Sequence, residues 1–229
     1  YKALEFLESH GFEISILPVD EKGHISLNEL EKTIRDDTVM VSIMTVNNEI
    51  GAVEDIHAIG ELIKKKNPNC LFNTDAIQAY GKMILHPKKD FVDLLSVSGH
   101  KLHGPKGIGF LFIDEKVKIN PILFGGGQQG GLRSGTLNIP GIAGMGLAAK
   151  MVYQDFPKKI EKLYELKDYF IEELEKLPEV KVNSEKGKAS APQIVSASFY
   201  GIKSEVLLHA LEEKGIYVSS GSACSSNHP

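Results

Sequence analysis

Polar side chains that could do chemistry stand at or just after the ends of three predicted strands. The strands fall within residues 38–46, 70–75 and 91–98, which are short and mostly apolar. Because ligands of open parallel sheets bind at the carboxyl ends of the strands, we expect these side chains to line one rim. The set comprises two amides, a carboxylate, a hydroxyl, an imidazole and an amine: Asn48, Gln78, Asp75, Ser98, His100 and Lys101.

The amine of Lys101 indicates the chemistry of this rim. Gly99 and Gly104 flank the lysine, so a cofactor could approach it closely. A lysine amine can form a Schiff base with an aldehyde, and pyridoxal 5′-phosphate (PLP) is the commonest cofactor of that kind. PLP withdraws electrons well only while its pyridine nitrogen keeps a proton, and a carboxylate beside that nitrogen holds the proton. Asp75 is the candidate carboxylate.

The other rim residues could bind the remaining polar groups of PLP. Ser98, His100 and Gln78 are candidates for the phosphate and the ring hydroxyl. Taken singly, such residues have simpler explanations, since an aspartate after a strand usually caps a helix and a lysine is usually a solvated charge. Their occurrence together at neighbouring strand ends favours a cofactor site.

A glycine-rich stretch, FGGGQQGGLRSGT, covers residues 124–136. Its glycines fit the spacing of a dinucleotide-binding motif, but that motif needs a helix directly afterwards. Gly135 and Pro140 oppose such a helix. The phosphate-loop motif of nucleoside triphosphatases (NTPases) is also absent. The stretch is therefore predicted to be a flexible loop with side chains suited to a phosphate or a subunit contact, Arg133, Ser134 and Thr136.

The two cysteines differ in setting. Cys70 begins a predicted buried strand and is expected to be a small core residue. Cys224 lies in SSGSACSSNHP, where an accessible thiol could be either a nucleophile or a spectator in a loose tail. Two cysteines are too few for a disulfide framework or a four-cysteine metal site, and no metal is expected.

Strands and helices alternate along the first part of the chain, which predicts an α/β fold with a mostly parallel sheet and helices on both faces. Further strands are expected at 12–19, 107–114, 193–200 and 216–220, and helices at 26–34, 54–66, 142–156, 159–177 and 204–215. We expect a large domain over residues 1–150 and a smaller C-terminal α/β domain over 151–229 that carries the Cys224 loop. The helix at 159–177 has an apolar stripe that is expected to face the core: Ile160, Leu163, Leu166, Phe170, Leu174 and Leu177.

Composition narrows the class of protein. The chain has 229 residues, 42% of them hydrophobic and 24% charged, with a net charge of −4 and no basic stripe, so no nucleic acid partner is expected. No apolar run approaches the ~18 residues of a membrane helix, so no membrane partner is expected and we expect a cytoplasmic location. The chain starts without Met in a helical pattern and stops in a loop, which favours a sequence incomplete at both ends.

Five segments resemble those of one family, in the same order over nearly the whole chain. They are VSIMTVNNEIG, TDAIQAYGK, SVSGHKLHGPKGIGFLFI, GGGQQGGLRSGTLNIPGIAGMG and SSGSACSS. The chain resembles the NifS/IscS-type cysteine desulfurases, which are PLP enzymes of the class V aminotransferase family with fold type I. The SGHK and RSGT segments, with a cysteine loop downstream, are the specific part of this likeness.

The resemblance implies a role for each rim residue. Lys101 would hold the cofactor as a Schiff base, Asp75 would pair with the pyridine nitrogen, and Gln78 would bond the ring hydroxyl. Ser98 and His100 would hold the phosphate, with His100 also counted among the catalytic residues. Thr136 would reach the phosphate bound by the other subunit of a homodimer, and Asn48 would lie beside the cofactor and the substrate carboxylate.

The resemblance also implies a reaction and its partners. Lys101 would move the α-proton of L-cysteine, and the Cys224 thiolate would take the substrate sulfur as a persulfide, releasing L-alanine. The persulfide would pass to an iron–sulfur scaffold protein or to another sulfur acceptor in a thiolation pathway. The cysteine loop fits the NifS/IscS group better than the group with a short loop.

The chain departs from the family pattern in ways that leave alternatives open. The family's Ala-Thr phosphate-binding pair, its cofactor-stacking His and its substrate-binding Arg lie in segments that this chain does not contain. One alternative is a selenocysteine lyase or related PLP lyase with the same fold. Another is a non-catalytic fragment that only dimerises or binds a sulfur-relay partner.

Overall fold

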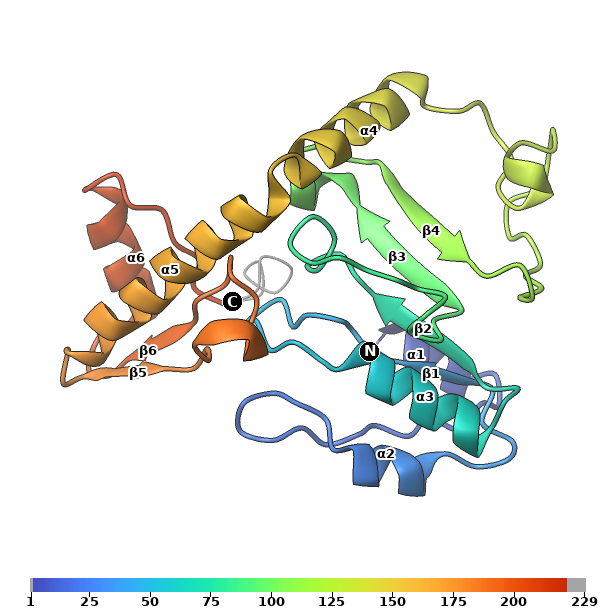
Figure 1. Cartoon of the computed structure of the whole chain (residues 1–229), viewed down its shortest axis with the longest axis horizontal. Coiled ribbons are helices and arrows are strands. Elements are labelled where there is room, and N and C mark those ends of the chain that lie inside the picture. Colours follow the sequence, from blue (N-terminus) through green and yellow to red (C-terminus); the bar gives the residue numbers. More distant parts are fainter. Residues whose placement is uncertain (1, 222–229) are drawn as a thin grey trace.

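The computed structural model describes residues 2–221, which form a four-stranded sheet and a separate two-stranded sheet joined by two long helices (Figure 1). The helices are α1 Lys2–Glu8, α2 Leu27–Thr33, α3 Ile56–Lys66, α4 Ile139–Tyr153, α5 Phe156–Glu175 and α6 Ser204–Glu212. The strands are β1 Met40–Ser42, β2 Leu71–Asp75, β3 Leu94–Ser98, β4 Gly109–Ile113, β5 Val180–Val182 and β6 Ala197–Phe199. Short 3₁₀ turns include η1 Gly99–Leu102 and η2 Gln129–Gly131.

The larger sheet has the strand order β1-β2-β3-β4. β1, β2 and β3 run parallel, and β4 pairs antiparallel with β3, so the sheet is mostly parallel as predicted. In Figure 1, α3 lies in front of these strands and the fainter α1 lies behind them. The predicted α/β class is therefore confirmed.

The hydrophobic core lies on the side of the sheet that α3 covers. Phe72 and Leu95 point from the strands into this core, and Ile59 and Ile63 meet them from α3. Successive strand residues point to opposite faces, so the neighbours of these core residues face the other way. The prediction that 38–46 is buried on both faces is wrong for one face, because Met40 is 46% exposed and Met44 is 39% exposed, whereas Val46 is buried.

A partly buried ionic network ties α3 to the two central strands. Lys64 of α3 forms an ion pair with Asp93, with 2.6 Å between Nζ and Oδ2, and also donates to the carbonyl oxygen of Cys70. The same Asp93 carboxylate accepts the backbone N–H of Phe72 at 2.6 Å. Cys70 is fully buried at the start of β2, as predicted, and burial raises the pKa of its thiol.

The rod formed by α4 and α5 connects the two sheets (Figure 1). Asn138 caps α4 by accepting the Gly141 N–H, and the rod breaks at Asp155, which has a left-handed φ of 52°. Pro157 then lies in the first turn of α5, where its missing N–H costs no helical hydrogen bond. The helix packs against β5 and so carries the smaller sheet.

The apolar stripe predicted for α5 does not face the core as a whole. The residues that α5 buries are Lys167, Ile171 and Leu174, whereas Leu166 and Phe170 are about half exposed (52% and 51%). A two-stranded sheet is too small to cover the full apolar width of a 20-residue helix. The prediction was therefore correct for Leu174 and wrong for Leu163, Leu166, Phe170 and Leu177.

Two predicted strands are absent. Residues 12–19 make only an isolated bridge between Val19 and Ile25, and residues 216–220 form no strand. Both segments have suitable composition, but among the described residues neither lies beside a strand edge that could satisfy its backbone groups.

Within residues 2–221, no helix is long and apolar enough to cross a membrane, and no cluster of metal-ligating side chains occurs.

The C-cap of α3 provides a test of this fold. The buried Asn67 side chain donates to the carbonyl oxygens of Arg35, Asp36 and Thr38, each at 3.1 Å, and so fixes the loop before β1. We expect Asn67→Ala to lower the free energy of unfolding by about 2 kcal/mol, because it leaves buried carbonyls without a donor. Urea unfolding would measure this.

Asn69→Ala is the matched control, because the Asn69 side chain is exposed. It should change the unfolding free energy by no more than about 0.5 kcal/mol. Equal unfolding midpoints for the two variants would contradict the role given to Asn67.

Candidate active site

The carboxyl ends of β2 and β3 form the rim on which the predicted residues gather. Asp75 is the last residue of β2 and pairs in register with Ser96, two residues before the end of β3 at Ser98. The rim is held on both sides, because Thr45 N–H donates to the Asp75 carbonyl and Ala76 N–H donates to the Ser96 carbonyl. Asp75 and Ser98 therefore lie at adjacent strand ends, as predicted.

Asp75 is only partly buried and uses one carboxylate oxygen locally. Its Oδ1 accepts the N–H of Ile77 at 2.8 Å, which fixes the start of the loop after β2. Among the described residues, its Oδ2 has no hydrogen-bond partner. The local bond explains the aspartate as a turn former, and the second oxygen is available for a ligand.

Ser98, His100 and Lys101 lie together at the turn that follows β3. The Ser98 hydroxyl and His100 Nδ1 are 2.7 Å apart in a hydrogen bond. Lys101 lies in η1, and its side chain is exposed. The turn closes through a Gly104 N–H to Gly99 carbonyl bond of 2.9 Å.

Close packing at this turn requires a glycine at position 99. A Cβ atom there would lie 3.0 Å from Cγ2 of Ile108 and 3.2 Å from the carbonyl oxygen of Pro105. A larger residue would push the chain outward and move His100 and Lys101 with it. The glycine thus sets the position of both side chains.

Asn48 occupies a turn that is held from the far end of the chain. It is exposed and donates to Glu49, while the preceding Asn47 side chain accepts the N–H groups of Glu49 and Ile50. The Ile50 carbonyl accepts hydroxyl hydrogens from Ser184 at 2.6 Å and Ser190 at 3.3 Å.

The same turn needs a glycine at its end. Gly51 has φ of +83°, and a Cβ there would meet the Ser190 hydroxyl at 2.7 Å. Ala191 N–H donates to the Gly51 carbonyl, and Ala52 forms a bridge with Ser190. The segment around Ser190 therefore fits closely against the loop that carries Asn48.

Gln78 is held from the same segment. Its carbonyl oxygen accepts the side-chain amide of Gln193 at 2.9 Å. The other amide atom of Gln193, Oε1, is buried and lacks a hydrogen-bond partner within the described part of the chain. Sequence reasoning missed Ser184, Ser190 and Gln193, because a short serine- and alanine-rich stretch gives no signal of such distant contacts.

Lys82 is a further residue that sequence reasoning missed. It lies seven residues beyond Asp75 and donates from Nζ to the main-chain carbonyl of Lys101 at 2.5 Å. The only signal was its place at the end of TDAIQAYGK, to which no role had been given. Lys82 thus links the loop after β2 to the turn after β3.

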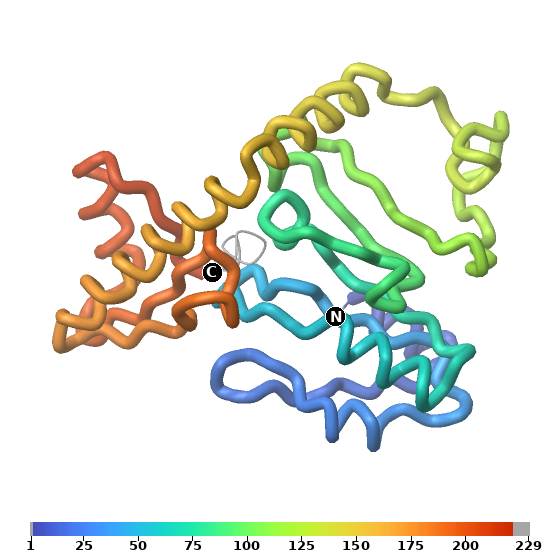
Figure 2. The backbone as a smooth tube through the Cα atoms, in the orientation of Figure 1, coloured from blue at the N-terminus to red at the C-terminus, as the bar shows by residue number. Residues whose placement is uncertain are grey.

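Thr136 does not join this group within the chain. It is exposed, and it belongs to the 115–138 segment that follows β4. Because β4 runs antiparallel to β3, with Leu94 opposite Ile113, this segment starts at the other end of the sheet, at the right of Figures 1 and 2. Cys224 lies outside the described residues.

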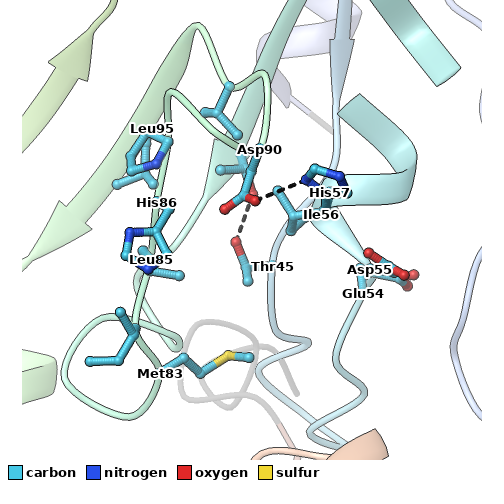
Figure 3. Close-up of a pocket in the computed structure, with 14 residues that line it drawn as sticks. Thr45, Glu54, Asp55, Ile56, His57, Met83, Leu85, His86, Asp90 and Leu95 are labelled. Carbon is cyan, nitrogen blue, oxygen red and sulfur yellow. Dashed lines mark hydrogen bonds and ion pairs between the residues drawn. The ribbon is translucent and has the colours of Figure 1, made fainter. Parts of the chain in front are cut away.

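A cavity of about 190 Å³ lies elsewhere, beside the amino end of α3 (Figure 3). Its lining includes Thr45 and Thr74, whose hydroxyls bond each other at 2.8 Å, and the His57–Asp90 pair at 3.3 Å. None of the predicted rim residues lines it. The reason is strand alternation, since Thr74 points to the core face and Asp75 to the opposite one.

Known proteins resemble this chain in sequence and in architecture. Residues 2–229 match the model of the family described as Aminotransferase class-V. The cysteine desulfurase IscS of Clostridium botulinum is 45% identical over 224 residues, which cover 97% of this chain and 56% of the relative. The IscS of Methanosarcina thermophila is also 45% identical, over 97% of this chain and 54% of its own length.

Solved structures agree. A NifS-like protein superimposes with a TM-score of 0.91 at 37% identity, over 96% of this chain and 60% of that one. A cysteine desulfurase from Thermococcus onnurineus gives a TM-score of 0.89 at 26% identity, over 96% and 59%. The chain thus spans little more than half the length of these relatives.

The resemblance inferred from five sequence segments is confirmed by these similarities, and the fold agrees with them. The family match runs through the rim residues, the glycine-rich loop and the two-stranded sheet alike. The chain belongs to the class V aminotransferase family.

Proposed function

We propose that this chain is the core of a PLP-dependent cysteine desulfurase, which converts L-cysteine to L-alanine and keeps the sulfur as a persulfide. The observation that carries the proposal is the adjacency of Asp75 at the end of β2 to the Lys101 turn at the end of β3. Similarity to IscS proteins at 45% identity supports the choice of reaction.

The donor set of the rim fits PLP. Lys101 supplies an exposed amine for the aldehyde, and the Oδ2 atom of Asp75 is available for the ring nitrogen. Ser98 and His100, already bonded to each other, offer a hydroxyl and an imidazole for the phosphate. Gln78 and Asn48 offer amides at the same rim for the ring hydroxyl and the substrate carboxylate.

The chemistry divides between cofactor and protein. When bound, PLP withdraws electrons from the α-carbon of an amino acid. The Lys101 amine would hold the cofactor and would move the proton at the α-carbon of the substrate. Asp75 would keep the ring nitrogen protonated, and the Ser98–His100 pair would fix the phosphate so that the reacting carbon stays over Lys101.

Cys224 would receive the sulfur. Its thiolate would attack the sulfur atom of the substrate, so that a sulfur–sulfur bond forms while the bond from that sulfur to the substrate β-carbon breaks. The electron pair of the broken bond stays with the substrate, which takes up protons and leaves as L-alanine. The two starting thiols thereby become one persulfide and one C–H bond, with no outside oxidant.

The wider assignment belongs to the same proposal. We propose a large PLP-binding domain over residues 1–150 and a small domain over 151–229, in a homodimer where Thr136 serves the partner's phosphate. The position of the 115–138 segment away from the rim supports a role for Thr136 in trans. We also propose a cytoplasmic location, and delivery of the sulfur to an iron–sulfur scaffold or other sulfur acceptor, which the likeness to IscS proteins supports.

Selenocysteine lyase is the second candidate, and the similarity to proteins named cysteine desulfurase favours cysteine over selenocysteine. Alanine release from the two amino acids would separate the activities. Faster release from selenocysteine, without persulfide on the protein, would favour the lyase.

The attachment of PLP to Lys101 is the first test. Protein mixed with PLP should develop a near-visible absorbance band, and borohydride reduction followed by peptide mapping should find the cofactor on Lys101. Lys101→Ala should abolish the band, because the amine proposed to attach the aldehyde is gone, while Lys82 is engaged with the main-chain carbonyl of residue 101.

Lys106→Ala is the control for Lys101, because Lys106 is another exposed lysine in the loop after η1. It should keep the full band. A wild-type protein that stays colourless with PLP would refute the proposed function.

The role of Cys224 is tested separately. Cys224→Ala should bind PLP as the wild type does but form no persulfide when L-cysteine is added, because the accepting thiol is gone. Persulfide labelling with a thiol-specific probe would measure this. Cys70→Ala should keep the labelling, and unchanged labelling in Cys224→Ala would show that a different group accepts the sulfur.

A further inference from the structure

Lys82 lies between two segments of the rim, in a stretch of backbone that is held on both sides. Its N–H donates to the Ala79 carbonyl at 2.9 Å. The Tyr153 hydroxyl, at the end of α4, accepts the Gly81 N–H at 3.0 Å and donates to the Met83 carbonyl at 3.1 Å. One tyrosine therefore anchors the residue before Lys82 and the residue after it.

The anchor is itself well packed. The ring of Tyr153 meets that of Tyr80 edge-on, with 5.5 Å between centroids, and burial raises the pKa of the Tyr153 hydroxyl, which keeps its proton. Gly81 has φ of +81°, and a Cβ there would touch Val152 at 3.1 Å. The Lys82 side chain consequently starts from a fixed point.

From that point the Lys82 side chain reaches the turn after β3. Its Nζ donates to the main-chain carbonyl of Lys101. Within residues 2–221, no carboxylate forms an ion pair with Lys82, in contrast to Lys64, which pairs with Asp93. Burial and the positive charge of Lys101 both lower the pKa of Lys82.

This arrangement is unusual for a lysine whose only task is solubility. A partly buried ammonium gains little from a neutral carbonyl compared with a carboxylate, and it is repelled by the nearby Lys101. What the contact provides is a constraint on the Lys101 peptide, from a donor that does not belong to the turn itself.

We propose that Lys82 is a positioning residue, which holds the main-chain carbonyl of Lys101 and thereby fixes the direction in which the Lys101 amine leaves the turn. The effect on cofactor attachment rests on the proposed function. The bracing of the turn does not, and it can be measured without any cofactor.

The first measurement is amide hydrogen exchange over residues 99–104 in cofactor-free protein. Lys82→Met keeps the length of the side chain but loses its charge and its donor, so exchange in this segment should become about tenfold faster. Lys82→Arg keeps both the charge and the donor and should stay close to the wild type. Lys106→Met is the matched control for loss of a lysine charge.

Exchange in α3 serves as the internal reference for folding, because α3 does not contact Lys82 through any hydrogen bond. It should be the same in all these proteins. If Lys82→Met does not fold, Lys82→Ala replaces it, with the same expected result, because alanine also lacks the charge and the donor.

The second measurement is the rate at which PLP attaches to Lys101, followed by the absorbance band. Lys82→Met should attach PLP about tenfold more slowly than the wild type, and Lys82→Arg should recover most of the rate. Unchanged exchange over 99–104 in Lys82→Met, or equal losses in Lys82→Met and Lys82→Arg, would overturn the inference. A wild-type protein without the band would refute the proposed function alone, and exchange would then decide the role of Lys82.

Discussion

The parallel register of β2 against β3 is the constraint on which the rest of the site depends. It is fixed at the start of both strands by Asp93, whose carboxylate accepts the Phe72 N–H and the Lys64 ammonium while its own N–H donates to the Phe72 carbonyl at 2.9 Å. A slip of one residue would turn every side chain of β2 to the opposite face. Thr74 would then replace Asp75 on the rim side, and the aspartate would enter the core uncompensated. The contacts of Asp93 at the start of β2 therefore help to fix the position of Asp75 at the other end of the strand.

The rim also depends on a segment that returns from the smaller sheet. Residues 184–193 place two serine hydroxyls on the Ile50 carbonyl and the Gln193 amide on the Gln78 carbonyl. Ser184 and Ser190 are almost fully buried, so these bonds are shielded from water and orient the loops firmly. Residues 184–193 follow α5 in the chain, so the rod of α4 and α5 determines their position relative to the larger sheet. Geometry at Asn48 and Gln78 is therefore coupled to the packing of α5 on β5, far along the chain.

Sequence reasoning could find the parts of the site that depend on local pattern. Short apolar runs that end in polar residues identified β2, β3 and the turn of Lys101, since strand direction alone places their ends on one rim. It could not find Lys82 or Gln193, because each acts through one hydrogen bond to a backbone carbonyl. Those carbonyls are 19 and 115 residues away along the chain. It also overestimated the burial of Leu166 and Phe170, since an apolar stripe states what could be buried but not how large the covering surface is. The roles of all the predicted site residues stay predictions, and Cys224 lies outside the described residues.

Two lysines of the rim carry like charges close to each other. Lys101 lies close enough to Lys82 to lower the pKa of the Lys82 ammonium, and in the described part of the chain neither lysine has a carboxylate partner. Like charges held close together repel each other, and a bound anion would offset that repulsion. An anion seated against Ser98 and His100 would relieve the repulsion, and a phosphate monoester carries the needed charge. The proposed function supplies such an anion, because the phosphate of PLP would lie against Ser98 and His100 at the end of β3.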